Sequence, residues 1–156
     1  MKRYLVYACV LAAVMLMAKQ DHPGSDVARL EPVGILRVTE KGGVVSIETD
    51  LGHYGTGETL DDAVTDMRQT ASGEVFLDTA EFLLISKGGA KWLPELCGLL
   101  RPSCQVCLSL GDIELGQAAE YLKFHKPQYS LRLYRKGERN MPLLFEKEGR
   151  MHLANS

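Results

Sequence analysis

The fold is decided by residues 44–67, which read VVSIETDLGHYGTGETLDDAVTDM. The first residues alternate between apolar and polar side chains, with Val45 and Ile47 on one face, and this pattern predicts a half-exposed strand. Residues 52–57 then contain three glycines, and we expect a flexible connection there. A strand followed at once by a helix would make this stretch the start of a mixed α/β arrangement.

The second half of the stretch predicts an amphipathic helix that begins after Thr59. Threonine is a good N-cap, and Asp62 stands three residues later, as in a capping box with Asp in place of Glu. Gly73 is a natural residue at which the helix would end. The apolar residues recur at helical spacing and would form one buried stripe: Leu60, Ala63, Val64 and Met67.

Strands and helices alternate on both sides of this stretch. Upstream, a strand over residues 33–38 would form a hairpin with residues 44–49 through Gly42 and Gly43. Residues 82–85 lack alternation, which is typical of a central strand buried on both faces. Further strands are predicted over residues 75–77, 104–110, 129–134, 142–145 and 151–153, and further helices over residues 92–100 and 113–124.

These elements predict an α/β (α+β) fold. We expect a mixed β-sheet with about three helices packed on it, preceded by an N-terminal apolar segment. We assign residues 1–18 to a signal peptide or membrane anchor, residues 19–28 to a linker, and residues 29–156 to a single mixed α/β domain.

The N-terminal segment carries the signal for location. Lys2 and Arg3 precede fifteen uninterrupted apolar residues, 4–18. As a helix they would span about 22 Å, short of the roughly 30 Å hydrocarbon core, which suits a signal peptide. Leu16 is large for a cleavage site, so an uncleaved anchor stays open. In both cases the positive flank predicts that the domain lies outside the cytoplasm, at the cell membrane or secreted.

Cysteine use leaves two questions open. Lipid attachment at Cys9 would need smaller residues before it than the sequence has. Cys104 and Cys107 form a C-x-x-C within a predicted strand, where residues three apart point to opposite faces. That geometry is wrong for a zinc or redox pair, so we expect small buried side chains, with a Cys97–Cys104 disulfide as the alternative.

Charge is unevenly distributed along the chain, although the net charge is only −2. Residues 44–82 carry nine acids and one base, whereas residues 121–150 carry eight bases and three acids. A net charge near zero argues against nucleic acid as a partner. The two stretches are either solvated faces that neutralise each other, or a basic patch that faces lipid headgroups or an acidic partner.

No catalytic, cofactor-binding or metal-binding residue is predicted. The four histidines, at positions 22, 53, 125 and 152, have no metal-type spacing. Ser86, Ser103 and Ser109 lack a nucleophile-elbow context. The glycines of residues 52–57 superficially suggest a phosphate loop, but acids stand where a Walker loop needs lysine. No cofactor is expected.

Three stretches between residues 49 and 103 carry a family resemblance. They are GTGETLDDA over residues 55–63, VFLDTAEFLLI over residues 75–85, and Ala90 with the helix before Arg101-Pro-Ser103. Together they resemble the N-terminal domain of the Ger(x)C-type spore germination proteins. The resemblance implies a membrane-anchored, non-enzymatic protein related to subunits of germinant receptors. Those proteins are much longer than this chain, so their partners are not carried over.

The sequence therefore predicts a non-enzymatic, membrane-associated extracytoplasmic interaction domain. The resemblance implies a link to sporulation or spore germination in an endospore-forming bacterium. The expected partners are the membrane, through the N-terminal segment, and a protein. The alternative is a small exported enzyme or ligand-binding protein whose site the sequence does not reveal.

Overall fold

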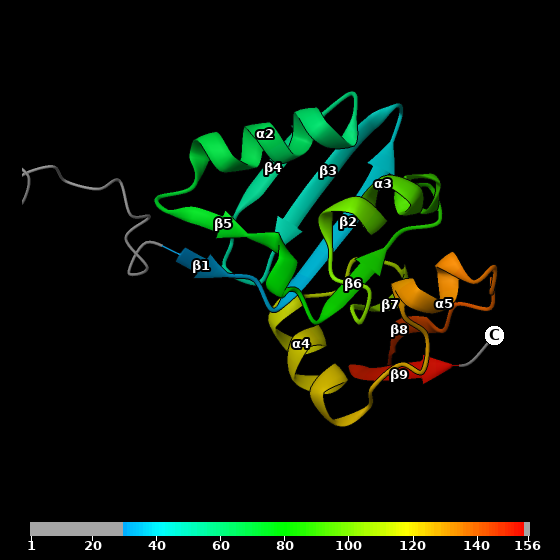
Figure 1. Cartoon of the computed structure of the whole chain (residues 1–156). Helices are drawn as coiled ribbons and strands as arrows, with labels where there is room; N and C mark the ends of the chain where they lie inside the picture. Colours follow the sequence, from blue (N-terminus) through cyan, green and yellow to red (C-terminus); the bar gives the residue numbers. More distant parts are fainter. Residues whose placement is uncertain (1–29, 155–156) are drawn as a thin grey trace, which may run out of the picture. The chain divides into compact units, whose positions relative to one another are not determined.

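The computed structural model describes residues 30–154, shown in colour in Figure 1. The predicted signal peptide or anchor, the linker over residues 19–28, Cys9 and His22 lie outside the described residues. From Glu31 onward the chain forms one compact unit. Among residues 30–154, no helix has the length and apolar character needed to cross a membrane.

The predicted α/β (α+β) class is confirmed by a mixed seven-stranded sheet of order β4-β3-β2-β6-β7-β8-β9. The four central strands, β2, β6, β7 and β8, run parallel, while β3, β4 and β9 join by antiparallel pairing. A separate two-stranded sheet pairs β1 with β5. The strands are β1 (Leu30–Pro32), β2 (Ile35–Lys41), β3 (Val44–Thr49), β4 (Tyr54–Gly57), β5 (Glu74–Phe76), β6 (Phe82–Ile85), β7 (Gln105–Leu110), β8 (Leu143–Lys147) and β9 (Arg150–Ala154).

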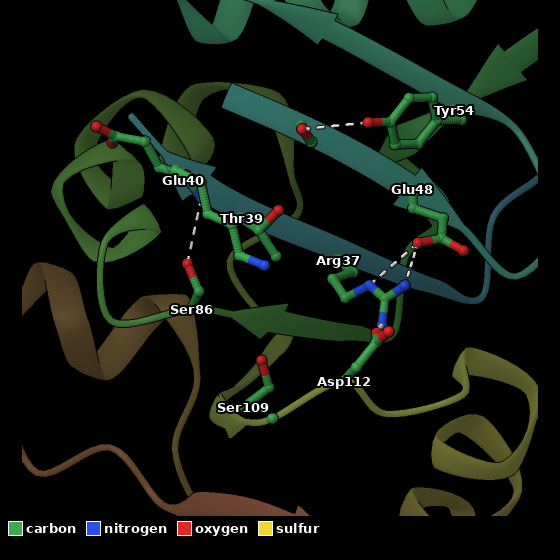
Figure 2. A pocket seen from close by; sticks show the side chains of 11 residues that line it. Arg37, Thr39, Glu40, Glu48, Tyr54, Ser86, Ser109 and Asp112 are labelled. Carbon is green, nitrogen blue, oxygen red and sulfur yellow. Dashed lines mark hydrogen bonds and ion pairs between the residues drawn. The ribbon is translucent and has the colours of Figure 1, made fainter. Parts of the chain in front are cut away.

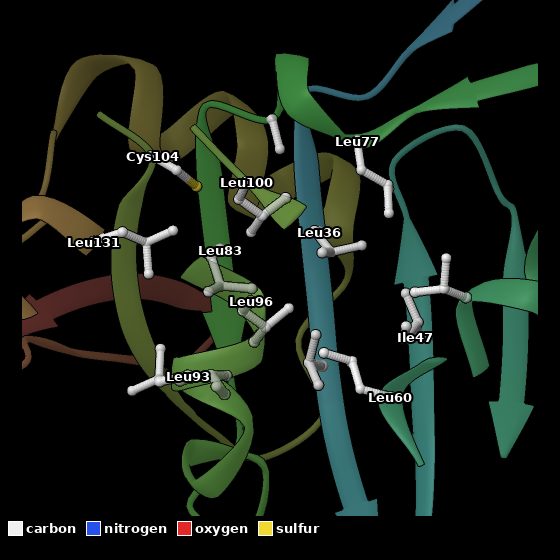
Figure 3. Close-up of a cluster of buried hydrophobic side chains, with 14 of the residues drawn as sticks. Leu36, Ile47, Leu60, Leu77, Leu83, Leu93, Leu96, Leu100, Cys104 and Leu131 are labelled. Atoms are coloured by element: carbon white, nitrogen blue, oxygen red, sulfur yellow. The ribbon is translucent and has the colours of Figure 1, made fainter. Parts of the chain in front are cut away.

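Helices cover the two faces of the sheet unequally. Figure 3 shows the larger core, in which β2 and β6 bury Leu36 and Leu83 beneath the side chains of α2 and α3. The opposite face packs Leu84 and Cys107 against α4 alone. The helices are α2 (Leu60–Thr70), α3 (Leu93–Leu99), α4 (Leu115–Phe124) and α5 (Leu131–Arg135), with short 3₁₀ turns η2 (Leu77–Thr79) and η3 (Gly89–Trp92).

Strand β6, the β2–β3 turn and the start of α2 form where the local sequence predicts them. All four residues of β6 are buried, which confirms a central strand. Gly42 and Gly43 both have positive φ, 61° and 85°, and they close the β2–β3 hairpin at the predicted position. Thr59 forms the capping box of α2 with Asp62, and the predicted stripe of that helix is buried.

Three predictions were wrong. Residues 52–57 are not a flexible connection, because Tyr54–Gly57 forms β4 at the edge of the sheet. Residues 129–134 are not a strand: Ser130 alone bridges to Gln105, and the chain then turns into α5. Helix α2 ends at Thr70, and its C-cap residue Ala71 is extended, so Gly73 does not terminate the helix.

Candidate functional site: a polar groove on the open face of the sheet

Helix α4 leaves part of its face of the sheet uncovered, and a polar groove of about 430 Å³ lies there. Figure 2 shows the groove, with side chains of β2 and β3 on one side and the end of β7 on the other. Ser86 follows β6, and Asp112 follows β7, so the groove lies at the carboxyl ends of parallel strands. Ligands of open α/β sheets bind at this end.

Arg37 of β2 is the central charged group of the groove. Its Nε donates to Oε2 of Glu48 on β3 at 3.1 Å, and a second nitrogen contacts the same carboxylate. Its third nitrogen donates to Asp112 Oδ1 at 3.1 Å and to the carbonyl oxygen of Ile113 at 2.6 Å. Arg37 therefore ties the loop after β7 to β2 and β3, and its charge is matched by two carboxylates.

Hydroxyl groups line the rest of the groove. The Tyr54 hydroxyl donates to Ser46 Oγ at 3.3 Å, and Ser86 Oγ accepts from the backbone N–H of Glu40 and of Gly89. Thr39 and Ser109 also line the groove. Within residues 30–154, their hydroxyls make no hydrogen bond. The residue Ser109 is 8% exposed, and its hydroxyl faces the cavity.

Glu40 borders the groove but directs its carboxylate elsewhere. Its two oxygens accept from Lys91 Nζ at 2.8 Å and from Trp92 Nε1 at 3.0 Å. The hydrogen bond from Lys91 holds the pKa of Glu40 below its ordinary value. Because this carboxylate is engaged with Lys91 and Trp92 of η3, it adds no free charge to the cavity.

The three histidines within residues 30–154 make separate structural contacts. His53 pairs with Glu31 through Nε2 and Oε2 at 2.5 Å. His125 stacks on Tyr121 with ring centroids 4.3 Å apart, and the ring of His152 stacks on Phe145. Across the described part of the chain, no group of histidine, cysteine and acidic side chains is arranged to hold a metal ion.

The three cysteines of the domain are buried free thiols. Cys104 belongs to the larger core and Cys107 to the core under α4, which confirms that they point to opposite faces. Burial raises the pKa of the Cys104 thiol and of the Cys107 thiol to about 12. Cys97 and Cys104 do not form the disulfide that the sequence left as an alternative.

The sequence predicts no site residue, so the groove was not expected. Ser86 and Ser109, which lack a nucleophile-elbow context in the sequence, line the groove with their hydroxyl groups. Arg37 was overlooked, although a charged residue in the apolar run Ile35–Val38 is a signal for a polar sheet face. The partner Asp112 lies 75 residues away along the chain, and no local pattern links the two.

Comparisons with known proteins identify no relative. No protein-family profile, curated protein or solved structure matches this chain. The resemblance to the Ger(x)C-type proteins therefore stays a prediction.

Proposed function

We propose that this chain is a non-enzymatic, membrane-associated extracytoplasmic domain that binds an acidic protein partner, with a role in sporulation or spore germination. The N-terminal apolar segment supports the location, and the resemblance over residues 49–103 supports the biological role. The binding function rests on how the structure distributes charge between the two ends of the sheet.

The observation that carries the proposal is a set of bases without acidic partners. Six exposed bases lie on α5, on the loop that follows it and on the β8–β9 hairpin; we call them the basic edge. Figure 1 shows these elements together at the end of the sheet away from β4. Among residues 30–154, none of the six forms an ion pair. The basic edge consists of Arg132, Arg135, Lys136, Arg139, Lys147 and Arg150.

In the acidic stretch, residues 44–82, several carboxylates make ion pairs or hydrogen bonds within the fold. Glu48 pairs with Arg37, and Asp50 Oδ1 accepts from the backbone N–H of Gly34 at 3.1 Å. Asp62 belongs to the capping box of α2, and Asp66 accepts from the backbone N–H of Thr56 at 2.8 Å. These hydrogen bonds position the carboxylates without cancelling their charge. The elements of the basic edge carry six bases against Glu138, Glu146 and Glu148, a net charge of +3. Such a surface steers association with an oppositely charged partner.

A reporter fusion tests the location. An enzyme reporter that is active only outside the cytoplasm, fused after Asp21, should be active, because the basic flank and the fifteen apolar residues direct export. The same fusion with Leu11→Arg and Val14→Arg should be silent. An inactive fusion of the unchanged sequence would contradict the proposed location.

Site-specific photo-crosslinking in the source cells tests the binding surface. A photoreactive amino acid at Lys136, in the basic edge, should give an adduct with one protein of acidic composition. The same group at Asp61, an exposed residue of α2, serves as the matched control and should not give that adduct. Equal adducts from both positions, or none from Lys136 and none from Arg132, would contradict a partner-binding role for the basic edge.

The polar groove favours a second candidate function, namely binding of a small ligand. Its cavity of about 430 Å³ is within the range of ligand pockets, which are commonly about 300–1,000 Å³. Its position at the carboxyl ends of the parallel strands supports the same interpretation. This function would operate at a different surface from the basic edge, so the two candidates are compatible.

A further inference from the structure

We infer that the polar groove binds a neutral polyhydroxylated ligand, such as a sugar residue of a glycan. This inference rests on the second candidate function and names its ligand class. It depends on three properties of the groove: balanced charge, free hydroxyl groups of both donor and acceptor character, and one exposed aromatic ring.

The charges of the groove cancel. Arg37 and Lys41 contribute two positive charges, and Glu48 and Asp112 contribute two negative charges, while the third acid of the lining, Glu40, is paired with Lys91. Arg37 is held between both carboxylates, so its charge is not available to an incoming anion. Arg37 in turn offsets part of the negative charge of the two carboxylates. A ligand without net charge loses the least when it displaces water from such a surface.

The polar groups that remain free can both donate and accept. The hydroxyls of Thr39 and Ser109 have no partner among the described residues, and each can do either. Ser46 Oγ accepts from Tyr54, which leaves its own proton free to donate. Asp112 uses only Oδ1 in contacts with the described residues, and its side chain is 98% exposed, so Oδ2 is an available acceptor. A sugar hydroxyl is both donor and acceptor and matches this mixture.

Ser109 supplies a free hydroxyl in the cavity. The residue is 8% exposed, and its hydroxyl makes no hydrogen bond to another of residues 30–154. A ligand hydroxyl can therefore replace solvent at this group, as donor or as acceptor. Figure 2 shows the hydroxyl directed into the groove, toward Arg37 and Thr39.

Tyr54 adds an apolar surface at the rim of the groove. The residue is 52% exposed, and its hydroxyl is fixed by Ser46, which orients the ring. An aromatic ring whose polar end is bonded presents an apolar body to a ligand. The C–H face of a sugar ring is the apolar surface of an otherwise polar molecule, so a ring beside hydroxyl groups suits a sugar better than a linear polyol.

Titration of the full-length chain with defined sugars tests the inference. The chain is kept in a detergent without a sugar headgroup, and calorimetry or NMR follows addition of chitotriose, maltotriose or inorganic phosphate. We expect at least one trisaccharide to bind with a dissociation constant between about 10 µM and 10 mM, and phosphate not to bind.

Variants assign the binding to the groove. Thr39→Val is isosteric and removes one free hydroxyl, and Tyr54→Ala removes the ring; each should weaken binding about tenfold or more. Phe76→Ala, which removes another exposed aromatic residue on β5, should leave it unchanged. Thermal unfolding of each variant verifies that it is folded.

Several results would overturn the inference. They are the absence of saturable binding for both sugars up to about 10 mM, binding of phosphate in their place, and sugar binding that Thr39→Val and Tyr54→Ala leave unchanged. If the crosslink at Lys136 forms while sugar binding is absent, the groove inference fails alone. If sugar binding is present while the crosslink is absent, the basic-edge proposal fails alone.

Discussion

Gly55 and Gly57 have a packing role, which explains why a glycine-rich stretch occurs in a structured region. A Cβ atom added at Gly55 would lie 2.2 Å from the carbonyl oxygen of Ala63 and 2.5 Å from the backbone nitrogen of Met67. One added at Gly57 would lie 2.4 Å from Cβ of Asp62. The two glycines therefore let the backbone of α2 lie directly against β4, and this contact accounts for residues that superficially suggest a phosphate loop.

Substitution of Gly55 should be strongly destabilising. Gly55→Ala should lower the free energy of unfolding by about 2 kcal/mol or more, because backbone atoms of α2 must move. Gly98→Ala is the matched control: Gly98 lies in α3, where an added Cβ meets no atom within 4 Å. There alanine should stabilise by about 0.5–1 kcal/mol through the unfolded state. Urea denaturation measures both, and a mild effect at Gly55 would contradict the close contact.

Cys104 and Cys107 should be chemically inert in the folded protein. The thiolate is the reactive form, and burial raises the pKa of both thiols to about 12. In a variant with Cys9→Ser and Cys97→Ser, iodoacetamide at pH 8 should alkylate neither thiol until denaturant is added. Mass spectrometry counts the adducts. Rapid labelling of the native protein at Cys104 or Cys107 would show that these thiols are accessible.

The same thiols make stability depend on alkaline pH. Their pKa is raised from an ordinary value of 9.0 to about 12 in the folded state, so above pH 9 the unfolded chain releases protons that the folded chain keeps. Their contribution is fully present below about pH 9 and is lost as the pH rises toward 12, at up to about 1.4 kcal/mol per pH unit for each thiol.

Burial also raises the pKa of Tyr129, which acts in the same direction. Chemical denaturation between pH 8 and pH 11 should therefore show falling stability. The double variant Cys104→Ala, Cys107→Ala should show a shallower fall, although it is less stable at pH 8. An unchanged slope in the double variant would contradict the assignment to the thiols.

At the scale of elements, the N-cap and the buried stripe of α2 were predicted from the sequence, although its C-terminal end was not. Val64 is 2% exposed within its stripe, so Val64→Asp should bury an unpaired charge and cost several kcal/mol, about 3–5, or abolish folding. Thr65→Asp, one residue further on the exposed face of the same helix, should change stability by less than about 0.5 kcal/mol. Thermal unfolding compares the two, and similar melting temperatures would mean that the buried face is wrongly assigned.

The cap of α2 has its own test. The Thr59 hydroxyl accepts from the backbone N–H of Asp62 at 3.1 Å. Thr59→Ala should cost about 1 kcal/mol, whereas Thr59→Ser keeps the acceptor and should cost clearly less. Equal losses for the two substitutions would show that the methyl group matters and not the hydrogen bond.

Elements with a strong local pattern could be predicted, whereas β4 and α5 could not. The stripe of α2, the apolar run of β6 and the Gly42-Gly43 turn are local signals. The β4 strand has little pattern of its own and exists because it pairs with β3 and packs under α2. Tyr129, Leu131 and Leu133 alternate like a strand, but the N–H groups of Leu133 and Tyr134 bond to the carbonyl of Ser130 and begin a helix.

At the scale of the whole molecule, the groove exists only because tertiary pairing brings separate segments together. Arg37 and Glu48 become neighbours through the β2–β3 register, in which they are directly opposite. Asp112 joins them because β7 lies two strands away from β2 in the sheet. The polar alternation of Ser46 and Glu48 predicted an exposed face, but which residues share that face depends on strand order.

The basic edge is likewise a property of the whole molecule, because it gathers bases from α5 and from the β8–β9 hairpin. The eight bases of residues 121–150 were evident in the sequence, but their lack of acidic partners in the described structure was not. If they steer a partner, association should weaken with salt, since the Debye length falls from about 10 Å at 0.1 M to about 3 Å at 1 M.

The most direct test of the proposed function is the salt dependence of the crosslink at Lys136 in membranes of the source cells. We predict that the adduct forms at about 0.05 M salt and falls at least tenfold by about 1 M. Arg132→Glu with Lys147→Glu should reduce it at low salt to a similar extent. Lys87→Glu, an exposed base outside the basic edge, should leave it unchanged. An adduct that is indifferent to both salt and charge reversal, or equally sensitive to Lys87→Glu, would contradict recognition of an acidic partner by the basic edge.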